Sequence, residues 1–362
     1  MFVRNLKLRN FKLHHALELQ FSERVCVITG RNGSGKTNLL DAIHHTGLLR
    51  SAFHREDARN IQFGELFYRI EALLEEDSRS FRLVLLCEAN KKKRVEWNGK
   101  AMERMTAHLG RLPMVLVLPD EPFQMNESSD WRRSAIDNVF SQAVDGYAEQ
   151  LGRFKKILNQ RNALLSYFAN GRRYDSLLLD ALDEELCLAS AAVWNLRNLN
   201  LPALNDGLNR EYQLLSSGRE NASMIYRSQL AEIPAEALLK SRRQQDLEAG
   251  RTTAGLHRDD FEYLLNGHSL RKYASQGQQK SFLLALKFAQ YEFIANCLGK
   301  SPCILLDDVF DKLDDERIES LLNRLSTPGM GQVFITDARE ERSRSLLSGI
   351  TCQMVSLERL SG

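Results

Sequence analysis

Eight consecutive residues near the N-terminus have the types and spacing of a phosphate-binding loop. They match the pattern G-x-x-x-x-G-K-[ST] and are Gly30, Arg31, Asn32, Gly33, Ser34, Gly35, Lys36 and Thr37. In such a loop the glycines let backbone N–H groups turn toward nucleotide phosphates, the lysine adds a positive charge, and the threonine hydroxyl is a ligand for Mg²⁺. We therefore predict a site for ATP and Mg²⁺, with Lys36 as a catalytic residue. The alternative is a glycine-rich turn that binds nothing.

The segments on either side of this loop have the hydrophobic patterns that the motif requires. Residues 25–28 form a short apolar run typical of a buried strand, and residues 38–43 have the pattern of a helix. A strand, a loop and a helix in this order place bound phosphates at the helix N-terminus, where backbone N–H groups lack helical partners.

Two neighbouring carboxylates end a second apolar segment. Residues 303–306 have the pattern of a buried strand, and Asp307 and Asp308 follow it directly. An aspartate in this place is the Walker-B arrangement, so we predict that Asp307 holds Mg²⁺ together with Thr37. We predict that Asp308 orients or deprotonates the attacking water, because a general base must lie close to the γ-phosphate. The alternative is a pair of solvated loop acids.

A third segment, at the start of a predicted helix, has the composition of an anion site. It contains Ser275, Gly277 and Gln278. In ABC-type ATPases a signature of this kind binds the γ-phosphate held by the other subunit. The alternative is an ordinary serine N-cap followed by a glycine for a tight turn. Because the segment lies between the phosphate loop and the Walker-B strand in the chain, we predict that these three residues contact ATP.

The order of the three segments indicates an ATPase domain that is split in the sequence. The signature follows the phosphate loop by more than two hundred residues, and much of the intervening chain is leucine-rich with helical spacing. We predict an α/β fold: an ABC/SMC-like P-loop ATPase head from residues 1–140 and 251–362, with an inserted helical second lobe over residues 141–250. Within the lobe, residues 151–168 and 182–196 predict an antiparallel helical hairpin. The split disfavours a transporter nucleotide-binding subunit.

Composition limits the remaining possibilities. The 362 residues are 43% hydrophobic and 27% charged, which is ordinary for a soluble globular protein, and the net charge is only +2. Any surface that binds DNA must therefore be a local basic patch. The candidates from the sequence are Arg132, Arg133, Arg172, Arg173, Arg242 and Arg243. The basic run at residues 91–94 is either a solvated hairpin turn or a phosphate-backbone contact.

Several classes of protein are disfavoured. No run of about 18 apolar residues is present and the N-terminus lacks a signal-peptide core, so we expect a cytoplasmic protein with no membrane partner. None of the six cysteines forms a C-x-x-C pair, and we expect free thiols without zinc or disulfides.

Five segments resemble the RecF family of bacterial recombination-mediator ATPases. They are Leu8–Phe11, Gly30–Ile43, Gly255–Asp260, Ser275–Lys280 and Leu305–Phe310. The third and fourth segments are specific to that family rather than to ABC ATPases at large, and the resemblance covers essentially the whole chain.

This resemblance implies an ATP-dependent DNA-binding protein with a weak, DNA-stimulated ATPase activity that serves as a switch. Such a protein would bind single- and double-stranded DNA, form a homodimer on ATP, and act with RecO and RecR. It would help load recombinase at single-strand/double-strand junctions in gap repair and feed the SOS response. Comparison with SMC-like ATPases also implies that Arg55 links DNA to the nucleotide, with a surface salt bridge as the alternative.

The chain departs from the family pattern at two places and from transporters at a third. Leu256 stands where the family has proline, and Asp311-Lys312 stand where it has Ser-Glu. Thr336-Asp337 replace the switch histidine of transporter ATPases, which argues against a transporter-type motor subunit. A DNA-binding module with an inactive ATP site is a further alternative, disfavoured by the intact lysine and carboxylates. A nuclease is disfavoured because the sequence shows no second metal-binding cluster.

Overall fold

The computed structural model describes residues 1–54, 56–171, 175–311, 313 and 315–357. They form two compact units, one of Met1–Glu121 with Ile294–Gly362 and one of Pro122–Phe293. The first unit is built from both ends of the chain, as predicted for the ATPase head. Four residues discussed above lie outside the described residues, namely Arg55, Arg172, Arg173 and Lys312.

A five-stranded parallel sheet forms one layer of the first unit. Its order is β14 (Cys352–Ser356), β3 (Val25–Thr29), β13 (Val333–Asp337), β12 (Cys303–Leu306) and β8 (Met114–Val117). Strands β3, β12 and β13 are buried along their whole length, which explains why they read as continuous apolar runs. Strand β13 lies between β3 and β12, so it separates the strand before the phosphate loop from the strand before Asp307.

A six-stranded antiparallel sheet forms a second layer. Its order is β2 (His14–Gln20), β1 (Phe2–Phe11), β4 (Phe67–Glu76), β5 (Arg79–Glu88), β6 (Arg94–Trp97) and β7 (Lys100–Ala101). Along β4 the residues alternate between buried and more accessible positions, as expected when one face of a sheet covers a core.

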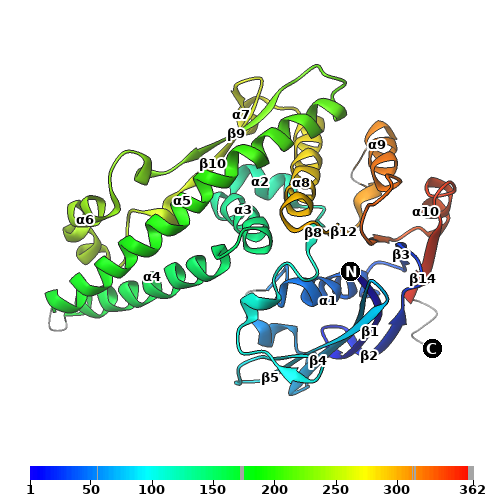
Figure 1. Cartoon of the computed structure of the whole chain (residues 1–362), viewed down its shortest axis with the longest axis horizontal. Coiled ribbons are helices and arrows are strands. Elements are labelled where there is room, and N and C mark those ends of the chain that lie inside the picture. Colours follow the sequence, from blue (N-terminus) through cyan, green and yellow to red (C-terminus); the bar gives the residue numbers. More distant parts are fainter. Residues whose placement is uncertain (55, 172–174, 312, 314, 358–362) are drawn as a thin grey trace. The chain divides into compact units, whose positions relative to one another are not determined.

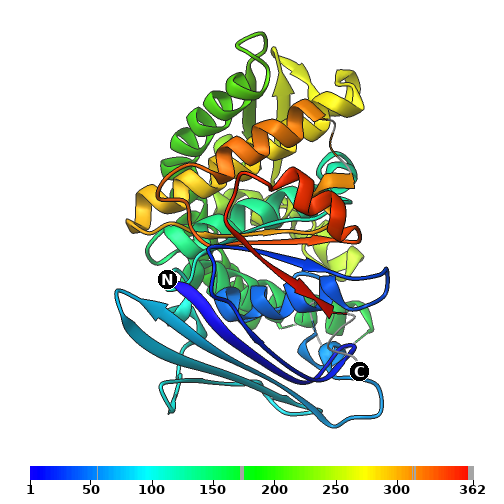
Figure 2. The ribbon, with the colours of Figure 1, turned by 90° about the vertical axis from the view of Figure 1, so that its right-hand side faces the viewer.

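Helix α1 (Lys36–Leu48) packs between the two sheets, as Figure 2 shows. Its buried residues Leu39, Leu40 and Ile43 share one hydrophobic core with residues of both sheets. The helix that follows the phosphate loop is thus fixed on two sides. Helices α9 (Asp315–Leu325) and α10 (Glu340–Leu346) and the short helices η1 (Asp57–Asn60), η2 (Met105–His108) and η5 (Val309–Asp311) complete the unit.

The second unit is mainly helical. It contains α3 (Ser129–Ala143), α4 (Tyr147–Ala169), α5 (Ser176–Leu215), η3 (Gln229–Ala231), α6 (Ala235–Ala249), η4 (Leu256–Arg258) and α7 (Leu270–Tyr273), and most of α2 (Glu121–Glu127) and α8 (Gln276–Leu298). Helices α4 and α5 pack side by side, which confirms the predicted helical hairpin (Figure 1). A three-stranded sheet in the order β11 (His268–Ser269), β10 (Asp260–Leu265) and β9 (Ala222–Arg227) is also present.

The bounds of the second unit differ from those of the predicted lobe. Strand β9 comes from the segment predicted to be helical, and it pairs with β10, which lies beyond residue 250. Helix α3 also belongs to this unit, although most of it precedes residue 141. The pairing of β9 with β10 and the packing of α3 on α4 and β10 place these segments in the second unit. Helical spacing in the sequence does not reveal such contacts.

Two buried arginines join the helices of the second unit to the segment Thr252–Asp260. Arg161 Nε and Nη1 lie 2.6 Å from Asp183 Oδ1 and 2.7 Å from Asp246 Oδ2, and Nη1 also donates to the Thr252 hydroxyl. Arg197 Nη2 and Nη1 lie 2.8 Å from Asp137 Oδ1 and 3.2 Å from Asp259 Oδ2. Removing one partner of such a pair leaves a buried charge uncompensated, so these networks fix the packing of the unit.

The structure also describes features that bear on a membrane span and on disulfide or metal sites, which the sequence disfavours. No helix in the described part of the chain is long and apolar enough to cross a membrane. All six cysteines are free thiols, and the described residues contain no group of three or more histidine, cysteine, aspartate or glutamate side chains that could hold a metal ion.

The stability of the protein should decrease in mild acid. Burial lowers the pKa of His44 and of His108 to about 4 in the folded chain. Below the usual imidazole pKa of about 6.5, the unfolded chain binds protons that these folded imidazoles do not, so acid favours unfolding. We expect the free energy of unfolding, measured with urea, to fall between about pH 7 and pH 5.

The variant His108→Gln removes one of these titrating groups and should make the fall shallower. The amide of glutamine can still donate to Thr46 O, which His108 Nε2 contacts at 2.7 Å. The matched control is the exposed His15→Gln. An equal pH dependence in His108→Gln and His15→Gln would contradict the assignment.

Candidate functional site

The phosphate loop connects β3 to α1. Its backbone conformation leaves the N–H groups at the start of α1 without a side-chain cap in the described part of the chain. Gly33 and Gly35 have φ of 85° and 92°, in the left-handed region that favours glycine. Gly35 directly precedes α1, and no side chain among the described residues caps the first turn of that helix. The first amides of α1 are therefore available to an anion, and the first turn carries no acidic residue to repel one.

The side chains of the loop fit an anionic ligand. Lys36 is buried, and its Nζ donates to Gly30 O at 2.8 Å and to Arg31 O at 3.2 Å. The hydroxyl of Ser34 is buried and has no hydrogen-bond partner among the residues that the structure describes. A cation held on carbonyls and a hydroxyl without a partner would both gain interactions from a bound phosphate.

Two strands and one helix bring Thr37, Asp307 and Thr336 together. The Thr37 hydroxyl lies 3.1 and 3.0 Å from the two carboxylate oxygens of Asp307. The hydroxyl of Thr336 on β13 donates to Asp307 Oδ1 at 2.7 Å and accepts from the backbone N–H of Asp308 at 2.9 Å. Because β13 lies between β3 and β12, its end ties the Walker-B aspartates to the strand that leads into the phosphate loop.

Asp307 is a buried carboxyl group in an environment that suits a metal ion. Its residue is 4% exposed, so the interpretation of Asp307 as a solvated loop acid is wrong. Burial raises its pKa above the usual value, although hydrogen bonds from Thr336 and Thr37 and the charge of Lys36 act in the opposite direction. A carboxylate and a hydroxyl within hydrogen-bond distance are the oxygen ligands that Mg²⁺ prefers. These two residues fit that ion.

Asp308 has an unusual backbone conformation. Its φ is 44°, in the left-handed region that a non-glycine residue seldom occupies. The bond from its N–H to the Thr336 hydroxyl holds this conformation at the end of β12. Such strain is found at functional sites where the surroundings fix the backbone.

The signature residues belong to the second unit, whereas Lys36, Thr37, Asp307 and Asp308 lie in the first. Ser275 Oγ accepts the N–H of Gln278 at 3.2 Å, and Gln278 Oε1 accepts the N–H of Ser275 at 2.8 Å. This is a capping box at the start of α8. The side chain of Gln278 also donates to Glu220 at 2.6 Å. Gln278 thus has structural partners, while Ser275 is exposed at the start of the 23-residue helix.

Comparison with known proteins identifies the family. Residues 2–356 match the family model described as the RecF/RecN/SMC N terminal domain. The DNA replication and repair protein RecF of Flavobacterium johnsoniae is 35% identical over 347 residues, which are 96% of this chain and 97% of that protein. RecF of Cytophaga hutchinsonii is 37% identical over 343 residues, 95% and 91% of the two chains.

The chain is a member of the RecF family. A solved structure of the recombination mediator protein RecF-ATP in the RecFOR pathway is 28% identical, covers 94% of this chain and 92% of that one, and has a TM-score of 0.85. The RecF-family fold confirms the predicted ABC/SMC-like ATPase architecture. Family membership assigns the chain a role in DNA replication and repair.

In this RecF-family protein, several basic residues suggested as DNA contacts are held in internal ion pairs. Arg132 forms a two-bond pair with Asp260, both bonds 2.8 Å long. Arg133 donates to Asp259 O and pairs with Asp130, and Arg243 pairs with Asp180 and Asp183. Arg242 donates to Gln245. The carboxylates of Asp259 and Asp260 in the run Gly255–Asp260 therefore bind arginines, namely Arg197 and Arg132.

Sequence reasoning gave no role to Thr336, and the structure shows that it positions both Walker-B aspartates. The residue was noted only because a histidine is absent there. Its position at the end of a predicted strand was the available signal, but the order of the strands, which places β13 beside β12, was not readable from the sequence.

The variant Thr336→Val should destabilise the protein more than Thr336→Ser. Valine has nearly the same shape but removes one of the donors to Asp307 Oδ1 and the hydroxyl that accepts the Asp308 N–H. We expect a loss of about 1–3 kcal/mol in the free energy of unfolding for removing these hydrogen bonds from buried groups. Urea unfolding of both variants tests this, since serine keeps the hydroxyl. Equal stability of the two variants would show that the hydroxyl bonds contribute nothing.

Proposed function

We propose that this RecF-family protein is an ATP-dependent DNA-binding protein that dimerises on ATP and acts as a recombination mediator. In this proposal it helps load recombinase at single-strand/double-strand junctions, contributes to gap repair and the SOS response, and works with RecO and RecR. The observation that carries the nucleotide part is the joining of Thr37 to Asp307 and Thr336 beside an open helix N-terminus. The solved RecF-ATP structure supports ATP as the ligand.

The phosphate loop would bind ATP through three kinds of group. Backbone N–H groups at the start of α1 would donate to the phosphates, and Lys36 would exchange its carbonyl partners for phosphate oxygens. Thr37 and Asp307 would hold Mg²⁺, which supplies charge stabilisation between the phosphates when bound. Residues Gly30–Ser34 would enclose the phosphates, with the Ser34 hydroxyl gaining a partner.

Hydrolysis would proceed at the end of β12. Asp308 would orient the attacking water and accept its proton, as the water oxygen forms a bond to the γ-phosphorus and the bond to the bridging oxygen breaks. Thr336 would fix the backbone of Asp308 during this step. Release of phosphate would remove contacts that hold the dimer together. Slow hydrolysis would therefore switch the protein from dimer to monomer.

The signature would complete the site of the partner subunit. Ser275 and Gly277 lie at the N-terminal end of α8, where the helix dipole and backbone N–H groups favour an anion. The capping box holds this turn in one conformation, so the role of Gln278 would be to position Ser275. A transporter-type motor is the weaker candidate. Thr336 stands where transporter ATPases have the switch histidine, and its hydroxyl binds Asp307 and the backbone of Asp308.

The oligomeric state should depend on nucleotide. Light scattering of the full chain should show a doubling of mass with ATP and none with ADP or without nucleotide. The variant Asp308→Asn should prolong the dimer because hydrolysis is slowed, whereas Ser275→Arg should prevent it by blocking the signature. The control Ser348→Arg changes an exposed serine elsewhere and should dimerise normally. A monomer in all conditions, despite measured ATP binding and with DNA present, would overturn the dimer model.

DNA binding should be sensitive to salt. If lysine and arginine contacts to phosphates dominate, the affinity measured by fluorescence anisotropy should fall at least ~10-fold between about 50 and 200 mM salt. The measurement compares single-stranded, duplex and junction DNA, each with and without ATP. Binding that does not change over this range would exclude a phosphate-dominated interface.

A further inference from the structure

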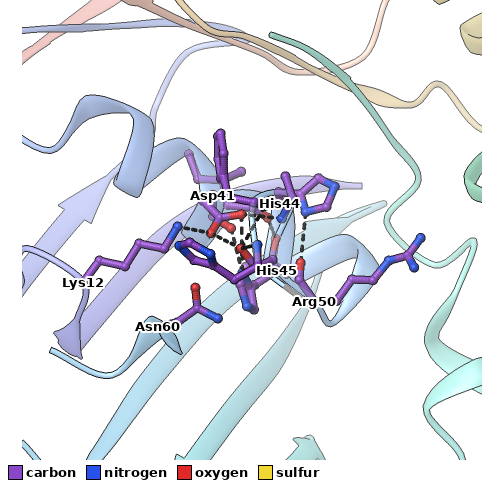
Figure 3. A network of polar contacts seen from close by, with 12 residues as sticks. Lys12, Asp41, His44, His45, Arg50 and Asn60 are labelled. Atoms are coloured by element: carbon purple, nitrogen blue, oxygen red, sulfur yellow. Dashed lines mark hydrogen bonds and ion pairs between the residues drawn. The ribbon is translucent and has the colours of Figure 1, made fainter. Parts of the chain in front are cut away.

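A buried carboxylate in α1 has no role in the ATP chemistry described above. Asp41 follows Thr37 by four residues, about one helical turn, and its side chain is 0% exposed. Figure 3 shows it surrounded by Lys12, His44, His45 and other polar groups. Burial alone would raise the pKa of Asp41, but the neighbouring His45, Lys12 and His44 lower it overall, so the carboxylate is ionised.

The carboxylate of Asp41 holds a surface segment in place. Its Oδ1 accepts the N–H of Ala52 at 2.7 Å, and its Oδ2 accepts the Ser51 hydroxyl at 2.7 Å. The Ser51 hydroxyl in turn accepts the N–H groups of Phe53 and His54, both at 3.1 Å. Phe53 and His54 are exposed, so one buried anion fixes the backbone of a segment whose side chains face solvent.

A lysine whose side chain is buried, Lys93, binds the chain on both sides of the segment Ser51–His54. The Lys93 side chain is 6% exposed, and its Nζ lies 2.7 Å from Asp57 Oδ1 and also donates to Leu49 O. Neither interpretation of the basic run 91–94, a solvated turn or a DNA contact, holds for this lysine. The surface segment is thus anchored on both sides, which is unusual for a connection at the surface.

The same carboxylate also holds the turn between β1 and β2. Lys12 Nζ lies 2.6 Å from Asp41 Oδ2 and 4.8 Å from the centre of the Phe53 ring. Two residues later, His14 Nε2 lies 3.1 Å from Gly35 O in the phosphate loop. A methyl group added at Gly35 would meet the His14 ring at 2.8 Å, so the turn and the loop are in close contact.

From these contacts we propose that Asp41 is a positioning residue that couples the nucleotide site to the surface segment Ser51–His54. The turn Lys12–His14 contacts the phosphate loop, Lys12 binds Asp41, and Asp41 binds Ser51 and Ala52. A change at the phosphate loop on ATP binding is therefore transmitted to Phe53 and His54 through one charged group. This inference rests on the proposed ATP binding, and it adds the surface that reports whether ATP is bound.

The cost of burying this charge supports a role beyond packing. A buried ion pair contributes little net stability compared with apolar residues of similar volume, and in several proteins its benefit is to specify one arrangement. Here the arrangement specified is that of two surface segments around the helix that begins at the phosphate loop. An apolar residue at position 41 would fill the same space but could not bind the Ser51 hydroxyl and the Ala52 N–H.

The test is amide hydrogen exchange at Ala52, Phe53 and His54 with and without ATP, together with the dissociation constant for ATP in each sample. In the wild-type chain we expect ATP to slow exchange at these amides at least threefold. In Asp41→Asn we expect faster exchange that ATP no longer changes, while the dissociation constant stays within threefold of wild type. A merely structural role would leave the ATP-dependent difference unchanged.

Two further variants keep the test decisive if Asp41→Asn folds poorly. Ser51→Ala removes only the hydroxyl that links Asp41 to Phe53 and His54, and Lys12→Met removes the link to the turn. Both should lose the ATP-dependent slowing. The matched control is Asp246→Asn, which removes a buried carboxylate of the second unit and should keep it.

Three outcomes would overturn the proposal, and they distinguish a failure of the coupling from a failure of the proposed function. Wild-type protein that binds ATP without slower exchange at these amides, or Asp41→Asn that retains the slowing, would overturn the coupling and leave the proposed function intact. Wild-type protein that does not bind ATP would overturn the proposed function itself and the coupling with it.

Discussion

The candidate ATP site depends on the hydrogen bonds that join Thr37, Asp307 and Thr336. These residues come from α1, the end of β12 and β13, three elements that are far apart in the sequence. The one hydroxyl of Thr336 donates to a carboxylate oxygen of Asp307 and accepts the N–H of Asp308. Without this bridge, the strained backbone at Asp308 would lose this hydrogen bond and the buried carboxylate one of its donors.

The sandwich of two sheets around α1 explains why this geometry is rigid. The helix packs on the parallel sheet and on the antiparallel sheet, so its N-terminus is fixed relative to β12 and β13. The same packing places Asp41 in an interior position, where it binds the turn Lys12–His14 and the segment Ser51–His54. One helix therefore begins at the predicted phosphate site and organises two surface segments.

In the second unit, ion pairs rather than apolar contacts alone join distant segments. Arg161 and Arg197 are fully or almost fully buried, and their carboxylate partners lie on several helices and in the run Gly255–Asp260. These pairs account for the two carboxylates at the end of this run in this chain. Because Asp259 and Asp260 already bind arginines, the run is a structural junction in this chain.

The sequence by itself determined the split head and the helical hairpin, and it predicted the phosphate loop and the Walker-B aspartates. These features depend on residue type and local spacing, such as the glycines around Lys36 and the apolar run before Asp307. The tertiary structure alone decided the order of the strands, which gives Thr336 its role, and the pairing of β9 with β10, which extends the second unit beyond residue 250. It also decided which charged residues are buried, because Asp41, Lys93 and Arg132 find partners 11, 36 and 128 residues away along the chain.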